Sequence, residues 1–364
     1  MKYVSFILLI LPFCVAAQQT TEERIDSLVM SQKQLSAVVL VADKGNPIYY
    51  KAIGNREFAK QIPLQVSDIF ELASVSKQFT AMIIMMLKEK GNLNYNDLVE
   101  KYLTIPYKGI TVRQLLTHTS GLPDYQEIMD KHWDKTKVAS NKEILEYLNQ
   151  YAPPKQFEPG TKYEYSNTGY VLLGSIAEKA SGKDFIVMCR EWIFGPLKMN
   201  STNIRTLAEK AATPNFAIGH IYVPEKQQYI RADSFPSSDY TIWLGSRKGP
   251  GRISSTAEDL LKWDQALYSS RLVKNSTLQE AFTRMKLSDG RMSNYGFGWE
   301  LPTDTTLGTV VMHTGDNPGY STRIVRYIDQ NKTIILLSNN NFPDFGKLVK
   351  EIEKLFPTKP QRTQ

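Results

Sequence analysis

The order of apolar and polar residues divides the chain into strand-like segments near its two ends and helical segments between them. Two strand-like runs near the N-terminus flank Lys44-Gly45-Asn46, which predicts a β-hairpin. A helical pattern over residues 21–33 precedes the first strand-like run, and another over residues 345–355 follows the last one. The runs near the C-terminus are "YGFGWEL", "GTVVMHTG", "STRIVRYI" and "KTIILLSNN", and the last two are joined by a predicted turn at 329–332.

From residue 74 to about residue 205 the apolar residues recur at helical spacing. The run "KQFTAMIIMMLKEKG" is apolar on nearly every side, which predicts a buried helix that ends at Gly91. Thr111 is the predicted N-cap of the next helix, and Ser255 or Thr256 caps a later one. The other predicted helices are "TVRQLLTHTSGLP", "NKEILEYLNQY", "NTGYVLLGSIAEKASG" and "STAEDLLKWDQAL", and residues 215–250 are mixed in pattern.

Strands at both ends with helices between them predict an α/β (α+β) fold. The simplest arrangement is an antiparallel sheet built from both ends of the chain, flanked by the terminal helices and carrying an inserted helical lobe. We expect a sheet lobe over about 18–73 and 290–364 and a helical lobe over about 74–289. The chain has 364 residues and no repeats, and we expect the two lobes to be intimately joined. A cleft is expected at their junction.

The first 17 residues have the pattern of a secretory leader. One lysine precedes an apolar stretch, and small residues lie at the expected cleavage site after Ala17. A membrane-spanning anchor is less favoured, because it needs roughly 20 apolar residues. Lipid attachment at Cys14 is disfavoured by the bulky Phe13 before it. The sequence therefore predicts an exported protein, periplasmic or secreted, with a single domain over 18–364 and no membrane span after cleavage.

Charge and cysteine content exclude several classes of function. The formal net charge of +7 falls to +6 without Lys2, and no run of clustered basic residues indicates nucleic-acid binding. Without the leader only Cys189 remains, which forbids an internal disulfide, and its apolar helical surroundings predict a core residue. We expect no metal or cofactor, since the four histidines lack the spacing of a metal site: residues 118, 132, 220 and 313.

Ser74 and Lys77 form the only S-x-x-K sequence in the chain. Residues three apart lie on one face of a helix, so the lysine can reach the serine hydroxyl. Burial lowers the pKa of a lysine and lets its amine accept a proton, and a helix start offers free N–H groups to a developing negative charge. The alternative is the polar start of an ordinary helix. The apolar run that follows Lys77 argues against a solvated lysine.

Two further segments support a reaction centre. Tyr165 and Asn167 lie in "FEPGTKYEYSNTGY" just before a predicted helix, where a phenol and an amide can converge on one ligand. A second Y-x-N sequence, Tyr147 to Asn149, falls inside a predicted helix, where residues two apart point in different directions. Only the loop copy is expected to contribute.

The third segment is His313-Thr314-Gly315, which ends an apolar strand-like run. A glycine there lets a substrate backbone approach the strand. A histidine at the end of a strand is more often structural. In combination with the other two segments it becomes a candidate site residue.

With these three motifs in this order, the chain resembles the serine β-lactamase and penicillin-binding-protein superfamily, and is most similar to its class C branch of β-lactamases, DD-peptidases and esterases. The resemblance covers nearly the whole chain after the leader and includes the segments "LLTHTSGLPDY" and "YGFGWE". It implies that Ser74 forms an acyl-enzyme and that Lys77 and Tyr165 share the proton transfers. It also implies that Asn167 orients Lys77 and the substrate amide.

The resemblance implies further roles for the third motif. His313 and Thr314, with Gly315, stand where many members carry Lys-Thr-Gly and contact the substrate carboxylate, and the backbone N–H groups of Ser74 and Asp316 form the oxyanion hole. A histidine in place of the lysine weakens the positive charge, and it becomes an imidazolium only below its ordinary pKa of about 6.5.

The resemblance leaves the substrate open. Our leading hypothesis is an exported serine hydrolase that acts on an ester or amide, such as a small molecule or a D-amino-acid peptide derived from the cell wall. A true class C β-lactamase is the second hypothesis, although no clear water-activating glutamate is present and Glu158 is expected to be structural. A catalytically weak protein that binds penicillin or cell-wall fragments is the third.

Overall fold

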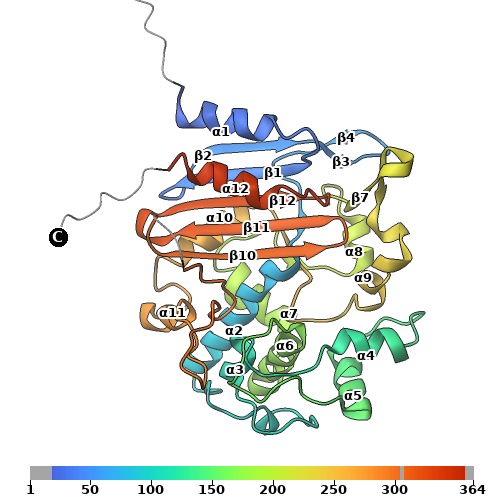
Figure 1. Cartoon of the computed structure of the whole chain (residues 1–364), viewed down its shortest axis with the longest axis vertical. Helices are drawn as coiled ribbons and strands as arrows, with labels where there is room; N and C mark the ends of the chain where they lie inside the picture. Colours follow the sequence, from blue (N-terminus) through green and yellow to red (C-terminus); the bar gives the residue numbers. More distant parts are fainter. Residues whose placement is uncertain (1–18, 304–306, 357–364) are drawn as a thin grey trace, which may run out of the picture.

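The computed structural model of the chain describes residues 19–303 and 307–356, so the predicted leader lies outside the described residues. A five-stranded antiparallel sheet forms the upper half of the molecule, in the order β10-β11-β12-β1-β2 (Figure 1). The two ends of the chain meet in its middle, where Val39 of β1 lies opposite Leu336 of β12. The strands are β1 (Ala37–Asp43), β2 (Asn46–Ile53), β10 (Val310–Asn317), β11 (Tyr320–Tyr327) and β12 (Lys332–Ser338). The predicted sheet is therefore confirmed.

The hairpin between β1 and β2 has the backbone that its sequence predicts. Lys44 and Gly45 have φ angles of 50° and 78°. Two successive residues of positive φ are the requirement of a type I′ turn, whose twist matches that of the flanking strands.

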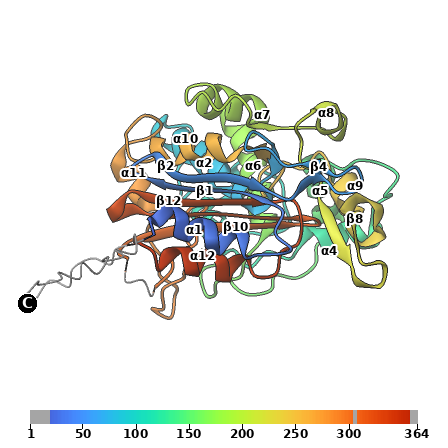
Figure 2. The same cartoon turned by 90° about the horizontal axis from the view of Figure 1, so that it is seen from above.

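Helices cover both faces of the sheet because the strand residues alternate between two apolar clusters. The outer face packs Val39 and Leu336 against Ile25 of α1 and Leu348 of α12, and Figure 2 shows these two helices side by side on that face. The inner face packs against α2 and α10. The bounds are α1 (Thr21–Met30), α2 (Lys77–Glu89), α10 (Ala257–Ala266) and α12 (Phe345–Glu353).

The helical half lies below the sheet, with α2 and α6 (Asn167–Ser181) packed together at its centre (Figure 1). The predicted cap Thr111 accepts a hydrogen bond at the start of α3, and Thr256 does so at the start of α10. The remaining helices are α3 (Val112–Leu116), α4 (Tyr125–His132), α5 (Asn141–Tyr151), α7 (Phe185–Met188), α8 (Leu207–Ala212), α9 (Tyr240–Trp243) and α11 (Asn275–Ala281). Cys189 is fully buried in this half, as expected.

Short strands complete the fold around the junction of the two halves. They form the pairs β3 (Asn55–Glu57) with β4 (Ile62–Pro63) and β7 (His220–Val223) with β8 (Gln228–Arg231), and a three-stranded sheet of β5 (Phe70–Glu71), β9 (Ile253–Ser255) and β6 (Asn203–Ile204).

One predicted strand is wrong. The segment "YGFGWEL" makes only isolated bridges, between Tyr295 and Glu300 and between Glu300 and Met312. Gly298 has a φ of 77°, and a Cβ atom there would come 2.8 Å from the Lys77 carbonyl oxygen. The glycines therefore let this segment turn closely around α2, where a regular strand would be straight.

The start of the buried helix also differs from the prediction. Ser74 lies in a 3₁₀ turn, Ala73–Ser76, and α2 itself begins at Lys77. Among the described residues, no helix has the length and apolar composition needed to cross a bilayer.

Candidate active site

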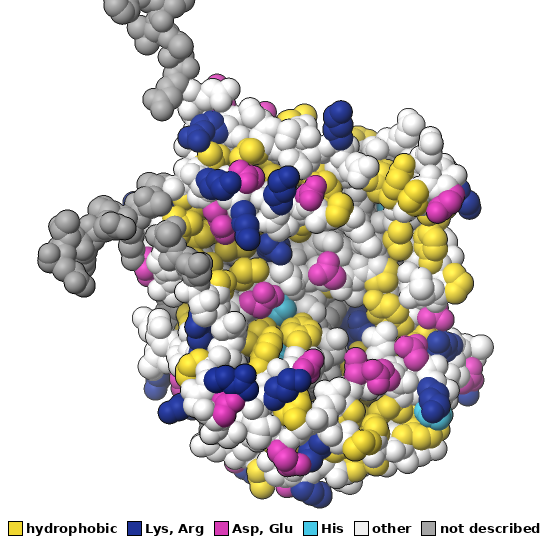
Figure 3. Space-filling view, viewed as in Figure 1, with side chains coloured by type: hydrophobic (Ala, Val, Ile, Leu, Met, Phe, Trp, Pro, Cys, Tyr) yellow, Lys and Arg dark blue, Asp and Glu magenta, His cyan; other side chains and the backbone are white. Residues whose placement is uncertain are grey.

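A pocket of about 590 Å³ lies between β10 and the helical half, where the space-filling view is hollowed near the centre (Figure 3). It is lined by Ser74, Tyr163, Tyr165, Asn167, Asn294, Glu300, Leu301, Pro302, His313, Thr314 and Asp316. The pocket thus brings together side chains from all three sequence motifs.

Ser74 is held at the pocket by a tight backbone connection. Leu72 N–H donates to the Ile253 carbonyl at 2.9 Å, and Ala73 then takes a φ of 48°. A positive φ is unfavourable for alanine and is maintained only when the surroundings fix it. The bend leads from β5 into the 3₁₀ turn and leaves Ser74 half-buried, facing the pocket.

Lys77 is fully buried behind Ser74. Its Nζ atom lies 2.9 Å from each of three oxygens: Ser74 Oγ, Asn167 Oδ1 and the Pro250 carbonyl. Burial, aided by the nearby Arg247 charge, holds the pKa of Lys77 well below 10.5. A neutral amine has two N–H bonds, which the amide and carbonyl oxygens can accept, and one lone pair, which then points to the Ser74 hydroxyl.

Tyr165 reaches the same serine from the loop before α6. Lys77 Nζ lies 4.8 Å from the centre of the Tyr165 ring, and the Tyr165 and Ser74 side chains line the same pocket. The side chain is 40% exposed, yet burial around its hydroxyl raises the pKa of Tyr165 well above 10. Tyr165 is therefore a phenol at neutral pH. Tyr147 lies inside α5, where its ring packs 5.5 Å from Trp133.

Asn167 is the first residue of α6, where the predicted helix "NTGYVLLGSIAEKASG" begins. Because its Oδ1 faces Lys77, its two amide N–H bonds are left for the pocket. Ser166 caps the helix through Gly169 N–H and donates its own N–H to His118 Nδ1 at 3.0 Å. His118 was not a candidate from the sequence, although "LLTHTSGLPDY" resembles a family segment.

His313 differs from the expectation of a titrating, substrate-facing residue. It is 1% exposed, Nδ1 lies 2.6 Å from the Thr314 carbonyl, and Nε2 lies 2.7 Å from the Tyr295 hydroxyl. Because a carbonyl only accepts, Nδ1 carries the proton and Nε2 accepts from Tyr295. Burial and the Lys77 charge lower the pKa of His313 to about 3. A neutral imidazole with both nitrogens bonded offers no charge to a carboxylate.

Gly315 allows β10 to pass directly beside the serine. A Cβ atom there would lie 2.3 Å from the Leu72 carbonyl oxygen and 3.2 Å from Ser74 N. No side chain fits between the strand and the turn.

The next residue, Asp316, directs its N–H outward. Met312 N–H and Thr314 N–H both donate to Glu300, away from β11. Since strand N–H groups alternate in direction, the Asp316 N–H also points to the open side of β10. The pocket lies on that side.

Glu300 is a pocket residue that the sequence motifs did not reveal. Its Oε1 accepts hydrogen bonds from Thr314 N at 3.2 Å and from Thr314 Oγ1 at 3.1 Å. It ends the segment "YGFGWE", which carried only a resemblance to the family and no role. Glu158, by contrast, is exposed and forms an ion pair with Lys155 at 2.7 Å, as expected of a structural residue.

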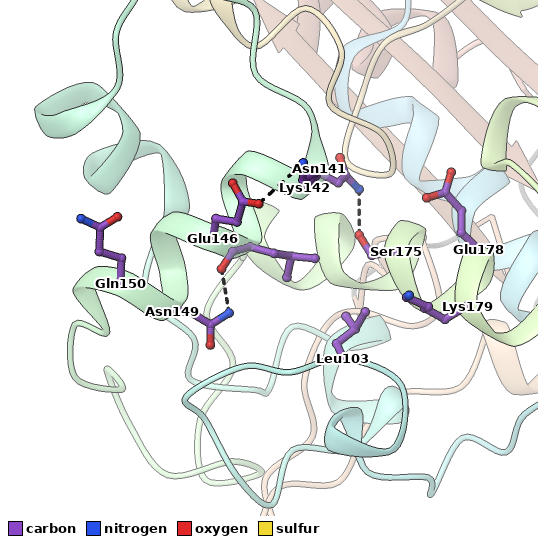
Figure 4. Close-up of a pocket in the computed structure, with 10 residues that line it drawn as sticks. Leu103, Asn141, Lys142, Glu146, Asn149, Gln150, Ser175, Glu178 and Lys179 are labelled. Carbon is purple, nitrogen blue, oxygen red and sulfur yellow. Dashed lines mark hydrogen bonds and ion pairs between the residues drawn. The ribbon is translucent and has the colours of Figure 1, made fainter.

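A larger pocket of about 700 Å³ between α5 and α6 lacks this chemistry. Figure 4 shows that its polar side chains are spread along the two helices. Asn141 Nδ2 bonds Ser175 Oγ at 3.1 Å, and Asn149 Nδ2 donates to the Leu145 carbonyl at 2.8 Å. The described residues also contain no group of acidic, histidine and cysteine side chains that could hold a metal ion. The Ser74 pocket is the better candidate.

Comparisons with known proteins place this chain among relatives of the same architecture. The family model described as Beta-lactamase matches residues 18–355. Penicillin-binding protein 4* of Bacillus subtilis (strain 168) is 40% identical over 309 residues, which cover 84% of this chain and 68% of that protein. A beta-lactamase of Escherichia coli (strain K12) is 27% identical, with 88% of each chain covered. The crystal structure of a penicillin-binding protein from Bacillus halodurans is 25% identical and has a TM-score of 0.79, covering 91% of this chain and 99% of that one.

Proposed function

Because the chain belongs to the β-lactamase family of serine hydrolases, we propose that it hydrolyses an ester or amide through an acyl-enzyme on Ser74. The observation that carries the proposal is the position of the Lys77 amine. It lies 2.9 Å from the Ser74 hydroxyl, while two carbonyl-type oxygens occupy its N–H bonds. A buried neutral amine in this arrangement is a general base for a serine nucleophile.

The proposed reaction begins when Ser74 Oγ attacks the substrate carbonyl carbon and its proton passes to Lys77 Nζ. The carbonyl oxygen becomes an oxyanion, which the N–H groups of Ser74 and Asp316 stabilise, by about 3–4 kcal/mol for each donor. When the tetrahedral intermediate collapses, the bond to the leaving group breaks. The Tyr165 phenol gives its proton to the leaving group and regains one from Lys77.

The second half of the reaction uses the same groups. Water attacks the acyl carbon as its proton passes to the Lys77 amine, with the Tyr165 phenol giving its own proton to Lys77 as it takes the proton of the water. The ester bond to Ser74 then breaks with return of the proton to Ser74 Oγ. Asn167 holds Lys77 through its oxygen and offers its N–H bonds to the substrate amide. The products are a carboxylic acid and an alcohol or amine.

The substrate class we propose is a D-amino-acid peptide or ester, or a β-lactam. Support comes from the Bacillus subtilis relative, whose name describes a penicillin-binding protein. A true class C β-lactamase is the alternative, supported by the name of the Escherichia coli relative. Glu158 gives no support to a dedicated deacylation step, because it is exposed and paired with Lys155.

We further propose that the protein is exported, to the periplasm or the medium, as a single domain over 18–364. The leader pattern of residues 1–17 supports export. The family match, which begins at residue 18, is consistent with this boundary.

The proposal is tested by incubating the protein with a fluorescent penicillin, a p-nitrophenyl ester and a D-Ala-D-Ala peptide, and by repeating each assay with Ser74→Ala. We expect covalent labelling and turnover in the wild type, and a loss of about 10⁴-fold or more in kcat with Ser74→Ala. Turnover that survives this substitution would exclude Ser74 as the nucleophile.

Ser76→Ala is the matched control. Ser76 lies in the same turn but is buried and does not line the pocket, and its Oγ accepts the Ile253 N–H at 3.2 Å. It should retain turnover and lose about 1 kcal/mol of unfolding free energy through an unpaired N–H. Labelling without turnover on any substrate would favour the weak binding protein.

A further inference from the structure

We infer that Glu300 makes the Ser74 pocket favour substrates with a neutral or cationic group on the Thr314 side of the scissile bond over those with a carboxylate there. The inference deepens the proposed function and depends on it. It names a specificity-determining residue that lies outside the three sequence motifs.

Among the residues that the structure describes, the charged side chains that line the pocket are both acidic. They are Glu300 and Asp316. Lys77 lies behind Ser74 with its Nζ enclosed by three oxygens, and His313 is buried with both nitrogens bonded. A substrate carboxylate at this end of the site would therefore find no cation among the lining residues.

The Glu300 carboxylate is fixed in place at the edge of β10. Its backbone exchanges hydrogen bonds with Met312 at 2.8 and 3.0 Å. Its Oε1 accepts both the Thr314 N–H and the Thr314 hydroxyl. The side chain remains 34% exposed. One carboxylate oxygen is thus anchored to the strand, and the group as a whole still faces the solvent-filled pocket.

Two arginines lie near this edge, but neither lines the pocket. Arg323 is opposite Thr314 in the register of β10 and β11, and its Nη1 atom lies 3.4 Å from the Cβ position of Gly346 on α12. Arg284 donates to the Leu301 carbonyl at 2.9 Å. Both guanidinium groups contact other parts of the protein and do not line the pocket.

The described lining of the pocket carries charge of one sign. In Figure 3, acidic side chains lie close to the hollow beside a small apolar patch, and Lys and Arg side chains also lie around it. Charges of one sign on the walls of a cleft focus the field and favour the opposite charge in the ligand. A carboxylate placed beside Thr314 would meet Glu300 as a like charge, whereas an ammonium would meet an opposite one.

The experiment compares three peptides that differ only in the charge of the leaving group. The acyl group is N-acetyl-D-alanyl in each. The leaving groups are D-alanine with its free carboxylate, D-alaninamide and D-alanine 2-aminoethylamide. For the wild type, we expect kcat/KM to rise from the carboxylate through the neutral amide to the cation, spanning about 10-fold or more, which corresponds to one favourable charge contact.

Glu300→Gln keeps an oxygen that can accept from Thr314 and removes the charge. We expect it to lower the ratio of kcat/KM for the cationic peptide to kcat/KM for the carboxylate peptide several-fold, toward one. Glu158→Gln is the matched control, because it removes an equal charge outside the pocket and should leave the ratio unchanged.

Several outcomes would overturn the inference. One is an unchanged ratio in Glu300→Gln while the neutral amide is still hydrolysed, and another is a wild type that prefers the carboxylate peptide. If Glu300→Gln loses all turnover, the wild-type ratio is measured against ionic strength. A ratio that falls as salt screens the charge supports the inference, and a constant ratio overturns it. Failure of the wild type on all three peptides and on a neutral p-nitrophenyl ester would instead refute the proposed function, and the inference with it.

Discussion

At the scale of single residues, the candidate site depends on one lysine that is kept away from water. Lys77 is fully buried, whereas the lysine of the Lys142–Glu146 pair on α5 is 77% exposed. Burial penalises the charged form of a lysine, so it lowers the pKa of Lys77 and favours the neutral amine that our proposal requires of a base. The oxygens of Asn167 and Pro250 then determine where its lone pair points.

We predict that Tyr165→Phe lowers kcat/KM by about 10²- to 10⁴-fold, the usual range for a lost proton-transfer group. The Tyr165 ring lies 4.8 Å from Lys77 Nζ, and Tyr165 lines the pocket together with Ser74. Tyr147→Phe is the control, since its ring packs against Trp133 within the helical half, and it should remain close to wild type. The two variants are compared by steady-state kinetics at matched stability. Equal losses would refute the assignment of Tyr165.

The pH dependence of kcat/KM on a neutral ester should reflect Lys77 and not His313. Because burial lowers the pKa of Lys77 well below 10.5, the active amine form appears as pH rises through this lowered pKa. Activity should then stay level, since the pKa of Tyr165 lies well above 10. His313, with a pKa of about 3, contributes no step near pH 6.5. A rate that keeps rising to a midpoint near 10.5 would show that Lys77 is charged at neutral pH.

At the scale of elements, two close backbone contacts position the turn that carries Ser74. Gly315 of β10 passes against Leu72, and Gly298 passes against the first turn of α2 at Lys77. Each contact leaves no room for a Cβ atom. The segment 295–301, which the sequence predicts as a strand, therefore turns around the start of α2 and places Glu300 in the lining of the pocket.

Gly298→Ala tests this contact. The substitution meets a φ of 77° and places a Cβ atom 2.8 Å from the Lys77 carbonyl. Gly290→Ala is the control, with a φ of 88° and nothing within 4 Å. We predict that Gly290→Ala costs about 1–2 kcal/mol from the backbone alone. Gly298→Ala should cost about 1–3 kcal/mol more and reduce kcat. Urea unfolding measures the free energy of unfolding of both variants. Similar losses would mean that the backbone shifts to make room for the Cβ atom at residue 298.

At the scale of the whole molecule, the sheet and the helical half share one apolar cluster. Leu40 of β1 and Ile335 of β12 lie in the same cluster as Phe79 of α2 and Leu172 of α6. The pocket sits where these parts meet, so its geometry depends on both.

We predict that urea unfolds the chain in a single transition. Buried Trp243 and Trp263 report on the helical half through fluorescence, and far-ultraviolet circular dichroism reports on the whole chain. A continuous core predicts coincident curves. Two separated transitions would show that the lobes are independent folding units, against the single domain that we propose.

The sequence by itself determined the local features of this protein. Apolar periodicity indicated the sheet strands and the principal helices, because the 2.0 and 3.6 residue repeats follow from backbone geometry. The hairpin at Lys44-Gly45 and the cap at Thr111 depend on neighbouring residues alone. The S-x-x-K pair was visible because both its members lie on one turn.

Only the tertiary structure decided what these residues meet. The wrap over 295–301 was misread as a strand, since its shape depends on contact with α2 and not on its own alternation. His313 was expected to titrate near 6.5, but partners distant in sequence bury it and bond its Nε2. The sequence gives Glu300 no role, because its position in the pocket depends on hydrogen bonds from Thr314, which lies on another segment. The charge and burial of a site residue, and how closely two backbones pass each other, depend on segments that folding brings together. A local sequence pattern holds no information about those distant segments.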